Sequence, residues 1–194
     1  MVVIQKKGST KLTFTFHKDY LNFAYDEKTG SGDIDVNYAN IPIKTSIVKE
    51  MNEWLRNVGI LWVIIGTLQI LRAFHLGLPM STRGFWLFVG MGCVGWAYLS
   101  KKIFTIFKTE NGNFFVLQNK DHDEIIFKLQ SRRKKQLFQW YGEIDFENDI
   151  ENEIGKFRWL ESQGVISQEE AENKIKQIEL MSDNSQEFKV IELN

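Results

Sequence analysis

The sequence predicts an α+β membrane protein, in which a small antiparallel β-domain is interrupted by a transmembrane helical hairpin and followed by a short α-helical tail. Two stretches of alternating apolar and polar residues, one before residue 45 and one after residue 107, predict the β-domain. A long region between them with very few charges predicts the hairpin. Apolar residues at helical spacing beyond residue 148 predict the tail.

Residues 1–44 read as the first half of the β-domain. The segment from Lys11 to Phe16 alternates apolar with polar residues, which is typical of a half-buried strand. The segment from Thr29 to Asp33 contains two glycines, which reach the backbone angles that a hairpin turn needs. Pro42 lacks a backbone donor and therefore closes this run of strands.

Residues 45–57 change from alternation to helical spacing. Ile47, Met51 and Trp54 are among the apolar residues on one face, and charged residues lie opposite. Two interpretations fit this segment: an amphipathic helix in the membrane interface, or a helix that caps the sheet. We favour the interfacial helix, because the segment leads directly into the uncharged region.

Residues 58–107 form the predicted transmembrane hairpin, with arms at about 58–78 and 84–104. Their uncharged runs, Val58–Leu71 and Gly84–Leu99, reach the roughly 20 residues of a spanning helix only when the flanks are included. The alternative is a pair of buried core helices in a soluble domain. We favour the membrane, because two arms that are apolar on every side need a surround that a chain of 194 residues can hardly supply.

Residue types that favour the membrane–water boundary lie near the ends of the arms. Aromatic rings with a polar edge settle in the headgroup layer, and basic side chains reach that layer by extending along the helix. The expected interface residues are Trp54, Arg56, Trp86, Lys101 and Lys102. Membrane lipids are therefore expected partners.

The distribution of basic residues predicts the orientation of the hairpin. Arg72 and Arg83 lie on the loop side, whereas more basic residues lie close to the arms on the side of the two termini. The latter are Lys44, Lys49, Arg56, Lys101, Lys102 and Lys108. The positive-inside rule then puts both termini in the cytoplasm of a multi-pass protein of the inner (plasma) membrane.

Small residues in the second arm have two interpretations. Gly90, Gly92 and Gly95 spell the G-x-G-x-x-G pattern of dinucleotide-binding loops, but that pattern belongs between a strand and a helix. In a membrane helix, small residues allow another helix to approach closely. We therefore expect no cofactor here, and we expect helix packing within the hairpin or between copies at Gly90, Gly92, Cys93, Gly95 and Ala97.

Residues 108–142 read as the second half of the β-domain with a closing helix. A hairpin turn is expected from Glu110 to Gly112, and a helix start from Asp121 to Glu124. The best lipid- or partner-binding candidate is the basic cluster near the end of this helix, Arg132, Arg133, Lys134 and Lys135. Its possible partners are anionic headgroups or the acidic C-terminal region, and the alternative is an ordinary solvated helix end.

Residues 148–181 predict two short helices joined by a tight turn, and residues 182–194 are assigned as a C-terminal tail. Gly164 is a residue type that commonly ends a helix. Ser167 and Glu170 form an S-x-x-E capping box, which starts the next helix. Because two such helices bury little on their own, they must dock on the domain, on another copy or on a partner.

These segments resemble two known families. We find a resemblance to the two halves of a bacterial pleckstrin-homology-like (PH-like) domain in KLTFTFHKDYLNFAYDEKTGSGDIDVNYANI and IFKTENGNFFVLQNKDHDEIIFKLQSRRKKQL. This resemblance implies a small β-sandwich or barrel that is closed by a helix and used for lipid or protein binding. The C-terminal region is similar to the SHOCT motif, a short helical hairpin thought to mediate oligomerisation, through Leu160, Gly164, Ile166, Ser167, Glu169 and Glu170.

Composition and charge argue against several other classes of protein. Residues 1–142 carry 19 Lys/Arg against 11 Asp/Glu, and residues 143–194 carry 5 against 14, so the acidic tail does not suit nucleic-acid binding. The single cysteine, Cys93, can form no internal disulfide, which agrees with a reducing compartment. The segment from Asp121 to Glu124 contains a histidine, but consecutive turn residues rarely converge on one metal ion. We predict no catalytic residue, metal, cofactor or small-molecule substrate.

These observations predict a non-enzymatic adaptor or scaffold in the inner membrane of a bacterium. Its cytoplasmic PH-like domain would bind a protein partner or anionic lipid, and its helical tail would serve homo-oligomerisation or a protein partner. Two alternatives stay open. One is an immunity or defence-system membrane protein in bacterial conflict, and the other is an oligomeric pore built from the hairpins.

Overall fold

The computed structural model describes residues 1–79 and 84–192, with side chains up to Leu180, and it has an α+β fold. Both sheets are antiparallel. The four-stranded sheet contains, in spatial order, β1 (Val2–Lys7), β2 (Thr10–Phe16), β3 (Tyr20–Glu27) and β4 (Gly30–Asn37). The three-stranded sheet contains β5 (Ser46–Glu50), β6 (Lys102–Thr109) and β7 (Gly112–Leu117).

The alternation predicted for the first strands is confirmed. Leu12, Phe14 and Phe16 of β2 are buried, whereas Lys11 is exposed, so the strand presents one face to the core. Phe14 lies opposite Phe23 of β3, and their ring centroids are 5.3 Å apart. Such cross-strand aromatic pairs fix the register, because a slip by one residue would turn every apolar side chain to water.

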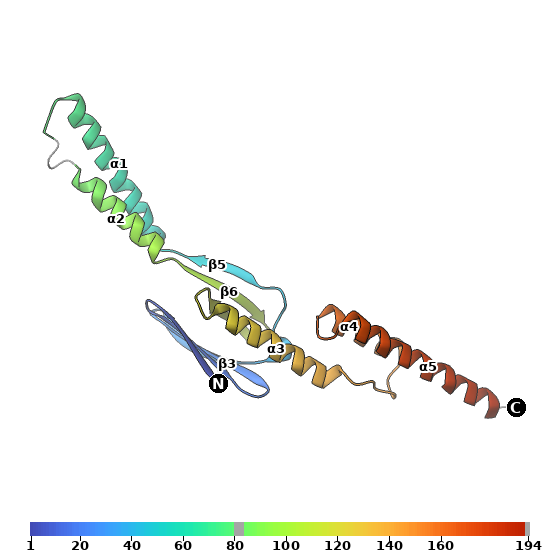
Figure 1. Cartoon of the computed structure of the whole chain (residues 1–194). Coiled ribbons are helices and arrows are strands. Elements are labelled where there is room, and N and C mark those ends of the chain that lie inside the picture. Colours follow the sequence, from blue (N-terminus) through green and yellow to red (C-terminus); the bar gives the residue numbers. More distant parts are fainter. Residues whose placement is uncertain (80–83, 193–194) are drawn as a thin grey trace.

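One apolar core lies between the two sheets and helix α3 (His122–Tyr141). From the second sheet, Phe107 and Phe114 stack with centroids 4.6 Å apart. Ile125 and Leu129 of α3 are fully buried in the same core, and Figure 1 shows α3 lying alongside the strands. The predicted closing helix is therefore present.

The side chain of Gln5 joins the two sheets where β1 and β7 meet. Its Nε2 donates to the carbonyl of Leu117 at 2.9 Å, and its Oε1 accepts from the Leu117 amide at 2.8 Å. The side-chain amide of Gln5 thus bonds to the backbone of β7, an edge strand, as a neighbouring strand would. Because Gln5 is only 1 % exposed, both bonds are shielded from water.

The prediction of an interfacial helix over residues 45–57 is wrong. Residues 46–50 form strand β5, and only residues from Glu53 onward are helical, as the start of α1 (Glu53–His75). The physical reason is pairing: β5 bonds along β6, and β-branched Ile47 and Val48 suit an extended backbone. The side chain of Asn52 accepts from the Leu55 amide at 3.0 Å and so fixes where the helix begins.

The predicted second arm, residues 84–104, is too long at its C-terminal end. Helix α2 (Phe85–Leu99) stops at Leu99, and the apolar residues that follow belong to β6. Phe104 and Phe107 are buried in the core of the β-domain, and burial there decides their conformation. The hairpin therefore interrupts the connection between two paired strands, β5 and β6, and projects away from the sheets (Figure 1).

Helices α1 and α2 approach each other closely at positions where small residues of one helix face the other helix. Gly59, Gly66 and Ala73 of α1 are buried, as are Gly90 and Ala97 of α2. A methyl group on Gly90 would lie 2.6 Å from the Val63 nitrogen, so the helices tolerate no side chain there. Gly90 and Ala97 are thus buried in the hairpin, and the Cβ of Cys93 lies at the same interface beside Gly59.

Gly92 and Gly95 lie outside this interface. A methyl group on either of them would meet no atom within 4 Å, so these two glycines do not serve packing within the hairpin. Their helical positions place them on the outer side of α2, which the sequence pattern alone could not separate from the inner side. Gly66 and Gly59, which face α2 from the first arm, were not predicted.

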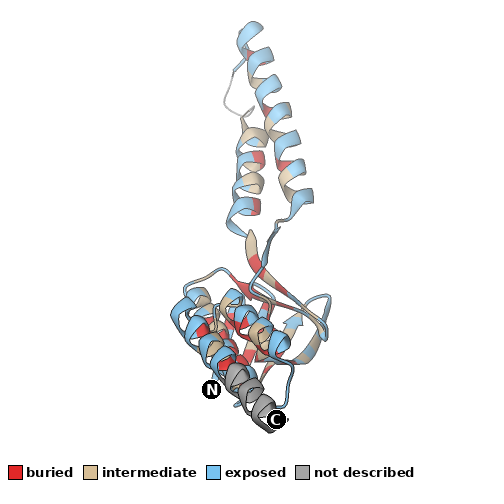
Figure 2. Ribbon diagram, turned by 90° about the vertical axis from the view of Figure 1, so that its right-hand side faces the viewer, coloured by how far each residue is buried: buried red, intermediate tan, exposed pale blue. Residues whose placement is uncertain are grey.

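The outward surface of the hairpin is apolar, and Figure 2 shows that much of it is exposed (pale blue). Large exposed side chains on it include Leu61, Leu68, Phe74, Phe88 and Leu99. By length and composition, α1 could cross a membrane, whereas α2 is a shorter apolar helix. Arg83, which was used to predict the orientation of the hairpin, belongs to residues 80–83, and these lie outside the described residues.

The C-terminal pair of helices, α4 (Ile150–Ser162) and α5 (Gln168–Glu192), has the predicted turn between them. Gly164 has φ +63°, and the capping box is formed, with Ser167 N donating to Glu170 at 2.9 Å. Leu160 and Ile166 are buried in a second apolar cluster with Leu137 of α3. The pair therefore docks on the β-domain, and α5 runs well past the predicted boundary at residue 181.

Candidate functional site

Five lysines line a cleft at the base of the hairpin, where the two helices meet the sheets. They come from four different parts of the chain, namely the ends of β1 and β5, the β3–β4 turn and the junction between α2 and the first residue of β6. The five are Lys7, Lys28, Lys49, Lys101 and Lys102. The cleft has a volume of about 1200 Å³, and we call it the lysine cleft.

Antiparallel pairing explains why these lysines gather. The β1–β2 and β3–β4 turns lie at the same end of the first sheet, because each strand reverses the direction of the one before it. In the second sheet Glu50 lies opposite Lys102, so the end of β5 and the start of β6 are also neighbours. The topology thus brings Lys7 and Lys28 to the roots of both hairpin helices.

Hydrogen bonds connect the two sheets within the lysine cleft. Lys7 Nζ donates to the carbonyl of Lys101. Lys102 Nζ donates to Thr10 Oγ1 at 2.7 Å, and Thr10 in turn donates to Glu27 at 2.8 Å. These bonds hold two of the ammonium groups in place, so that the cleft is a preformed positive site.

The wall that belongs to the hairpin is apolar and aromatic. Trp96 is 67 % exposed, Leu99 is 80 % exposed, and both line the cleft. Trp54, at the first turn of α1, is also largely exposed. Cationic side chains and exposed amphipathic rings are the residue types that favour a membrane–water boundary.

The electrostatic balance of the lysine cleft is positive. Glu50 and Glu53 are the acidic residues among those that line it, against five lysines. Ammonium groups on long flexible side chains bind phosphate as point charges, without the planar geometry that arginine imposes. The lysine cleft therefore has the charge to bind an anionic group such as a phosphate, beside the apolar surface of Trp96 and Leu99.

The residues of the basic cluster predicted at 132–135 differ in their exposure to solvent. Arg133 is only 3 % exposed: its Nε donates to the carbonyl of Ile41 at 2.7 Å, and its guanidinium also reaches Gln163 at the end of α4. Lys134 and Lys135 are exposed. Arg133 thus serves the docking of α4 on the β-domain and is not accessible to a lipid.

Arg132 is also used within the fold. Its guanidinium lies over the rings of Phe16 and Tyr38, at 5.5 and 5.4 Å from their centroids, and donates to the Tyr38 hydroxyl at 3.1 Å. Burial raises the pKa of Tyr38, and the nearby Arg132 charge opposes that shift only in part. Burial also lowers the pKa of Arg133.

The acidic segment after α3 does not fold back onto the basic cluster. Among the described residues the ion pairs join His122 to Asp123, Lys128 to Glu124 and Lys156 to Glu153, and none of them connects the two regions. Asp149 instead caps α4, accepting from the Glu151 amide at 3.2 Å. A local capping bond competes well with a long-range contact between flexible, solvated side chains.

Two of the predicted interface residues have other contacts. Trp86 stacks on Trp62 with ring centroids 4.0 Å apart, so it packs between the helices near the loop end of α2. The side chain of Arg56 is half-buried and bonds to Asn57 Oδ1 at 3.1 Å. Of the predicted interface set, only Lys101 and Lys102 line the lysine cleft, with Trp54 close by on α1.

Sequence reasoning missed the contribution of Lys7 and Lys28. A signal was present, since each lies at a turn between two strands that could be predicted as neighbours. Turns at the same end of a meander lie together, and that rule would have grouped them. Lys49 was noted as a basic residue near the first arm but was assigned to a helix, which concealed its position at the end of β5.

The histidine of the 121–124 segment takes part in a half-buried polar contact. His122 Nε2 lies 2.9 Å from Thr105 Oγ1, and its Nδ1 lies 2.7 Å from Asp123 Oδ1. Thr105 is 6 % exposed, and the contact ties α3 to β6. Among the side chains that the structure describes, in residues 1–79 and 84–180, no group of His, Cys, Asp and Glu is arranged to hold a metal ion.

Comparisons of this chain with protein-family models, with curated proteins and with solved structures gave no match.

Proposed function

We propose that the protein is a non-enzymatic membrane adaptor of the bacterial inner membrane, with a PH-like cytoplasmic domain held against the bilayer by the α1–α2 hairpin. The observation that carries this proposal is the exposed apolar hairpin rising from the lysine cleft. An apolar surface of this extent is unfavourable in water, at roughly 25 cal/mol per Å². A bilayer removes that cost and places the lysines at its headgroups.

The arrangement of the β-domain supports the PH-like part of the proposal. A four-stranded and a three-stranded antiparallel sheet are followed by a C-terminal helix that contributes to the core. The turn at Gly164 and the capping box at Ser167 and Glu170 support a SHOCT-like helical pair. Because that pair buries its apolar face on Leu137 of its own chain, we propose that it completes the domain and needs no second copy for this face.

The lysine cleft supports anionic lipid as the ligand nearest the membrane. Each lysine near a negatively charged leaflet contributes roughly 1 kcal/mol of attraction. The positive-inside rule supports a cytoplasmic position for the same residues and for both termini. The acidic residues after position 142 lie at the opposite end of the molecule from the hairpin, where an anionic leaflet does not repel them (Figure 1).

The first test concerns the membrane itself. Cells that express the full chain are fractionated, and the membranes are washed with high salt and with alkaline carbonate. We expect the protein to stay in the membrane fraction and to be released only by detergent. A chain that is monodisperse in buffer without detergent would refute the proposal.

The second test concerns the lysine cleft. Thermal unfolding of the detergent-solubilised chain is followed with added phosphatidylglycerol or phosphatidylcholine, because a ligand that binds the folded state raises the melting temperature. We expect stronger stabilisation by phosphatidylglycerol, and loss of the difference in the triple variant Lys28→Gln/Lys49→Gln/Lys101→Gln. The matched control changes three lysines away from the lysine cleft, Lys120→Gln/Lys135→Gln/Lys176→Gln, and should respond like the wild type. An equal loss in both variants would show that only net charge matters.

A further inference from the structure

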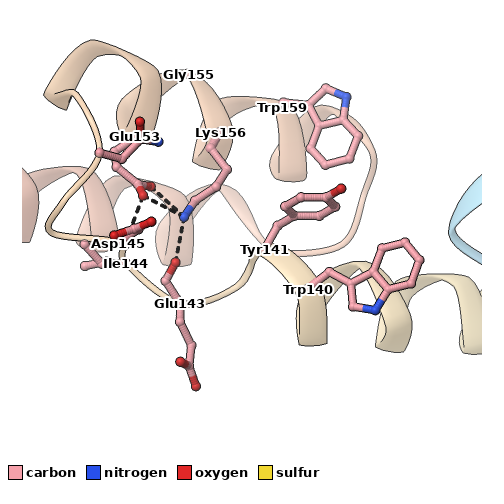
Figure 3. A pocket seen from close by; sticks show the side chains of 10 residues that line it. Trp140, Tyr141, Glu143, Ile144, Asp145, Glu153, Gly155, Lys156 and Trp159 are labelled. Atoms are coloured by element: carbon pink, nitrogen blue, oxygen red, sulfur yellow. Dashed lines mark hydrogen bonds and ion pairs between the residues drawn. The ribbon is translucent and has the colours of Figure 1, made fainter.

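Three aromatic side chains form one wall of a depression between the end of α3 and α4 (Figure 3). The rings of Trp140 and Tyr141 meet edge to face with centroids 6.2 Å apart, and Tyr141 meets Trp159 at 5.6 Å and 89°. All three are exposed, at 51 %, 42 % and 42 % respectively. The depression has a volume of about 830 Å³, which suits one or two side chains of a partner.

The floor of the depression is preformed by a buried ion pair. Glu153 is 2 % exposed, and Lys156 Nζ lies 2.9 and 2.6 Å from its two carboxylate oxygens. The same ammonium group donates to the carbonyl of Glu143 at 2.7 Å, and Glu153 accepts from the Asp145 amide at 3.0 Å. These bonds hold the linker after α3 in place, so the aromatic wall and the rim keep a fixed geometry.

The rim of the depression is acidic. Glu143 and Asp145 line it and are exposed, and Figure 3 shows the Glu143 carboxylate extending away from Lys156. Every second residue from Glu143 to Glu153 is acidic, and among the described side chains Glu153 is the one of these that is both buried and ion-paired. The Lys156 side chain is only 18 % exposed, and its ammonium group is bonded to Glu153 and to the Glu143 carbonyl, so the exposed rim is mainly negative and aromatic.

The position of the depression indicates its occupant. It lies at the end of the molecule opposite the hairpin, so the bilayer that we propose around α1 and α2 cannot cover it (Figure 1). An anionic leaflet would also repel its rim. Aromatic faces beside carboxylates recognise guanidinium and ammonium groups, through cation–π attraction and charge-assisted hydrogen bonds.

We propose that this depression docks an arginine- or lysine-bearing peptide segment of a partner protein. The cation would stack on the wall of Trp140, Tyr141 and Trp159, and the carboxylates of Glu143 and Asp145 would bind its N–H donors. This inference goes beyond membrane anchoring and uses the anchoring only to exclude lipid as the occupant. Peptide binding is measured in detergent, so its failure and the failure of the membrane proposal are distinguishable.

The experiment uses the full chain in a non-ionic detergent and fluorescein-labelled decapeptides of alternating glycine and arginine, or glycine and glutamate. Binding is followed by fluorescence anisotropy at 150 mM salt, roughly the physiological ionic strength. We expect the arginine peptide to bind and the glutamate peptide not to bind. The charge variant Glu143→Gln/Asp145→Asn keeps the shape of both side chains but removes their charge, and it should bind at least tenfold more weakly. Trp140→Ala should also weaken binding about tenfold.

The matched control is Glu169→Gln/Glu179→Gln, which removes two exposed carboxylates from α5 and should change the affinity less than twofold. An equal loss in the control would overturn the proposal, because the attraction would then be general to the acidic region. Unchanged binding by the charge variant or by Trp140→Ala would overturn it as well. Self-association that Trp140→Ala abolishes would assign the depression to a second copy of this chain and so refute the peptide assignment.

Discussion

Replacing Gly90 by alanine tests whether the α1–α2 contact holds the hairpin together. The new methyl group would lie 2.6 Å from the Val63 nitrogen and 2.7 Å from the Gly59 carbonyl oxygen. Both are backbone atoms, which cannot rotate away. Since non-bonded heavy atoms need roughly 3.5 Å, the helices would have to separate by on the order of 1 Å at this level.

The expected cost follows from this separation. Overpacking of a well-fitted interface costs about 1–3 kcal/mol in the free energy of unfolding. For a chain of this size each kcal/mol corresponds to about 2–4 °C in melting temperature. We therefore expect Gly90→Ala to lower the melting temperature of the hairpin by several degrees, or by more where the stacked pair of Trp62 and Trp86, 4.0 Å apart, is also lost.

The matched control is Gly92→Ala, two residues further along the same helix. A methyl group there meets no atom within 4 Å, so it only removes the conformational freedom of glycine. This change should be neutral or stabilising by roughly 0.5–1 kcal/mol. Melting is followed in detergent by near-ultraviolet circular dichroism, which reports the stacked tryptophans. Equal melting temperatures for the two variants would refute the inferred helix contact.

Three further substitutions test the β-domain. Gln5→Glu places a carboxylate against the Leu117 carbonyl, and we expect it to lower the free energy of unfolding, measured by chemical denaturation at pH 7, by about 1–3 kcal/mol. The loss should be smaller in acid, because the protonated carboxyl group can donate to that carbonyl. Burial raises the pKa of Tyr38, so its contribution to stability is fully present below the unfolded pKa of about 10 and is lost as pH rises through the higher folded pKa. Tyr38→Phe should therefore reduce the loss of stability at alkaline pH, measured by urea denaturation between pH 8 and 11. An unchanged dependence of the unfolding free energy on pH would contradict this reasoning. Arg133→Met removes the charged donors that bond to the Ile41 carbonyl and to Gln163, and should lower the free energy of unfolding by about 1.5–3 kcal/mol. Limited proteolysis should then release α4 and α5 faster. The control Lys134→Met should not have this effect.

The strands and caps could be predicted from the sequence because their signals are local. The alternation around Phe14 and the capping box at Ser167 depend on neighbours within a few residues, and both are present in the structure. The outcome for Arg133 depended on Gln163, thirty positions away, and no local pattern reports that contact. The lysine cleft is of the same kind, since its residues come together only through the topology of two sheets.

Residues 45–57 show a local signal overridden by pairing. Their apolar residues fit helical spacing, but β6 offers a partner strand, and backbone hydrogen bonds along a ladder outweigh a weak periodic preference. Because β5 and β6 are paired, the two chain ends that enter the hairpin are fixed side by side. This arrangement positions the helices on the domain more firmly than a flexible linker would.

The same competition shortened the second helix, and that sets how the hairpin fits a bilayer. With 15 residues α2 is about 22 Å long, against a hydrocarbon thickness of about 30 Å, whereas the 23 residues of α1 exceed that thickness. If Trp96 and the lysine cleft lie at the surface of the bilayer that we propose, α2 falls short of the opposite surface at its loop end. There α1 carries the exposed polar residues Gln69 and Arg72, which need water or headgroups and reach them if the bilayer thins locally. We therefore expect the proposed membrane to be thinner beside the hairpin, with the lysine cleft at its surface.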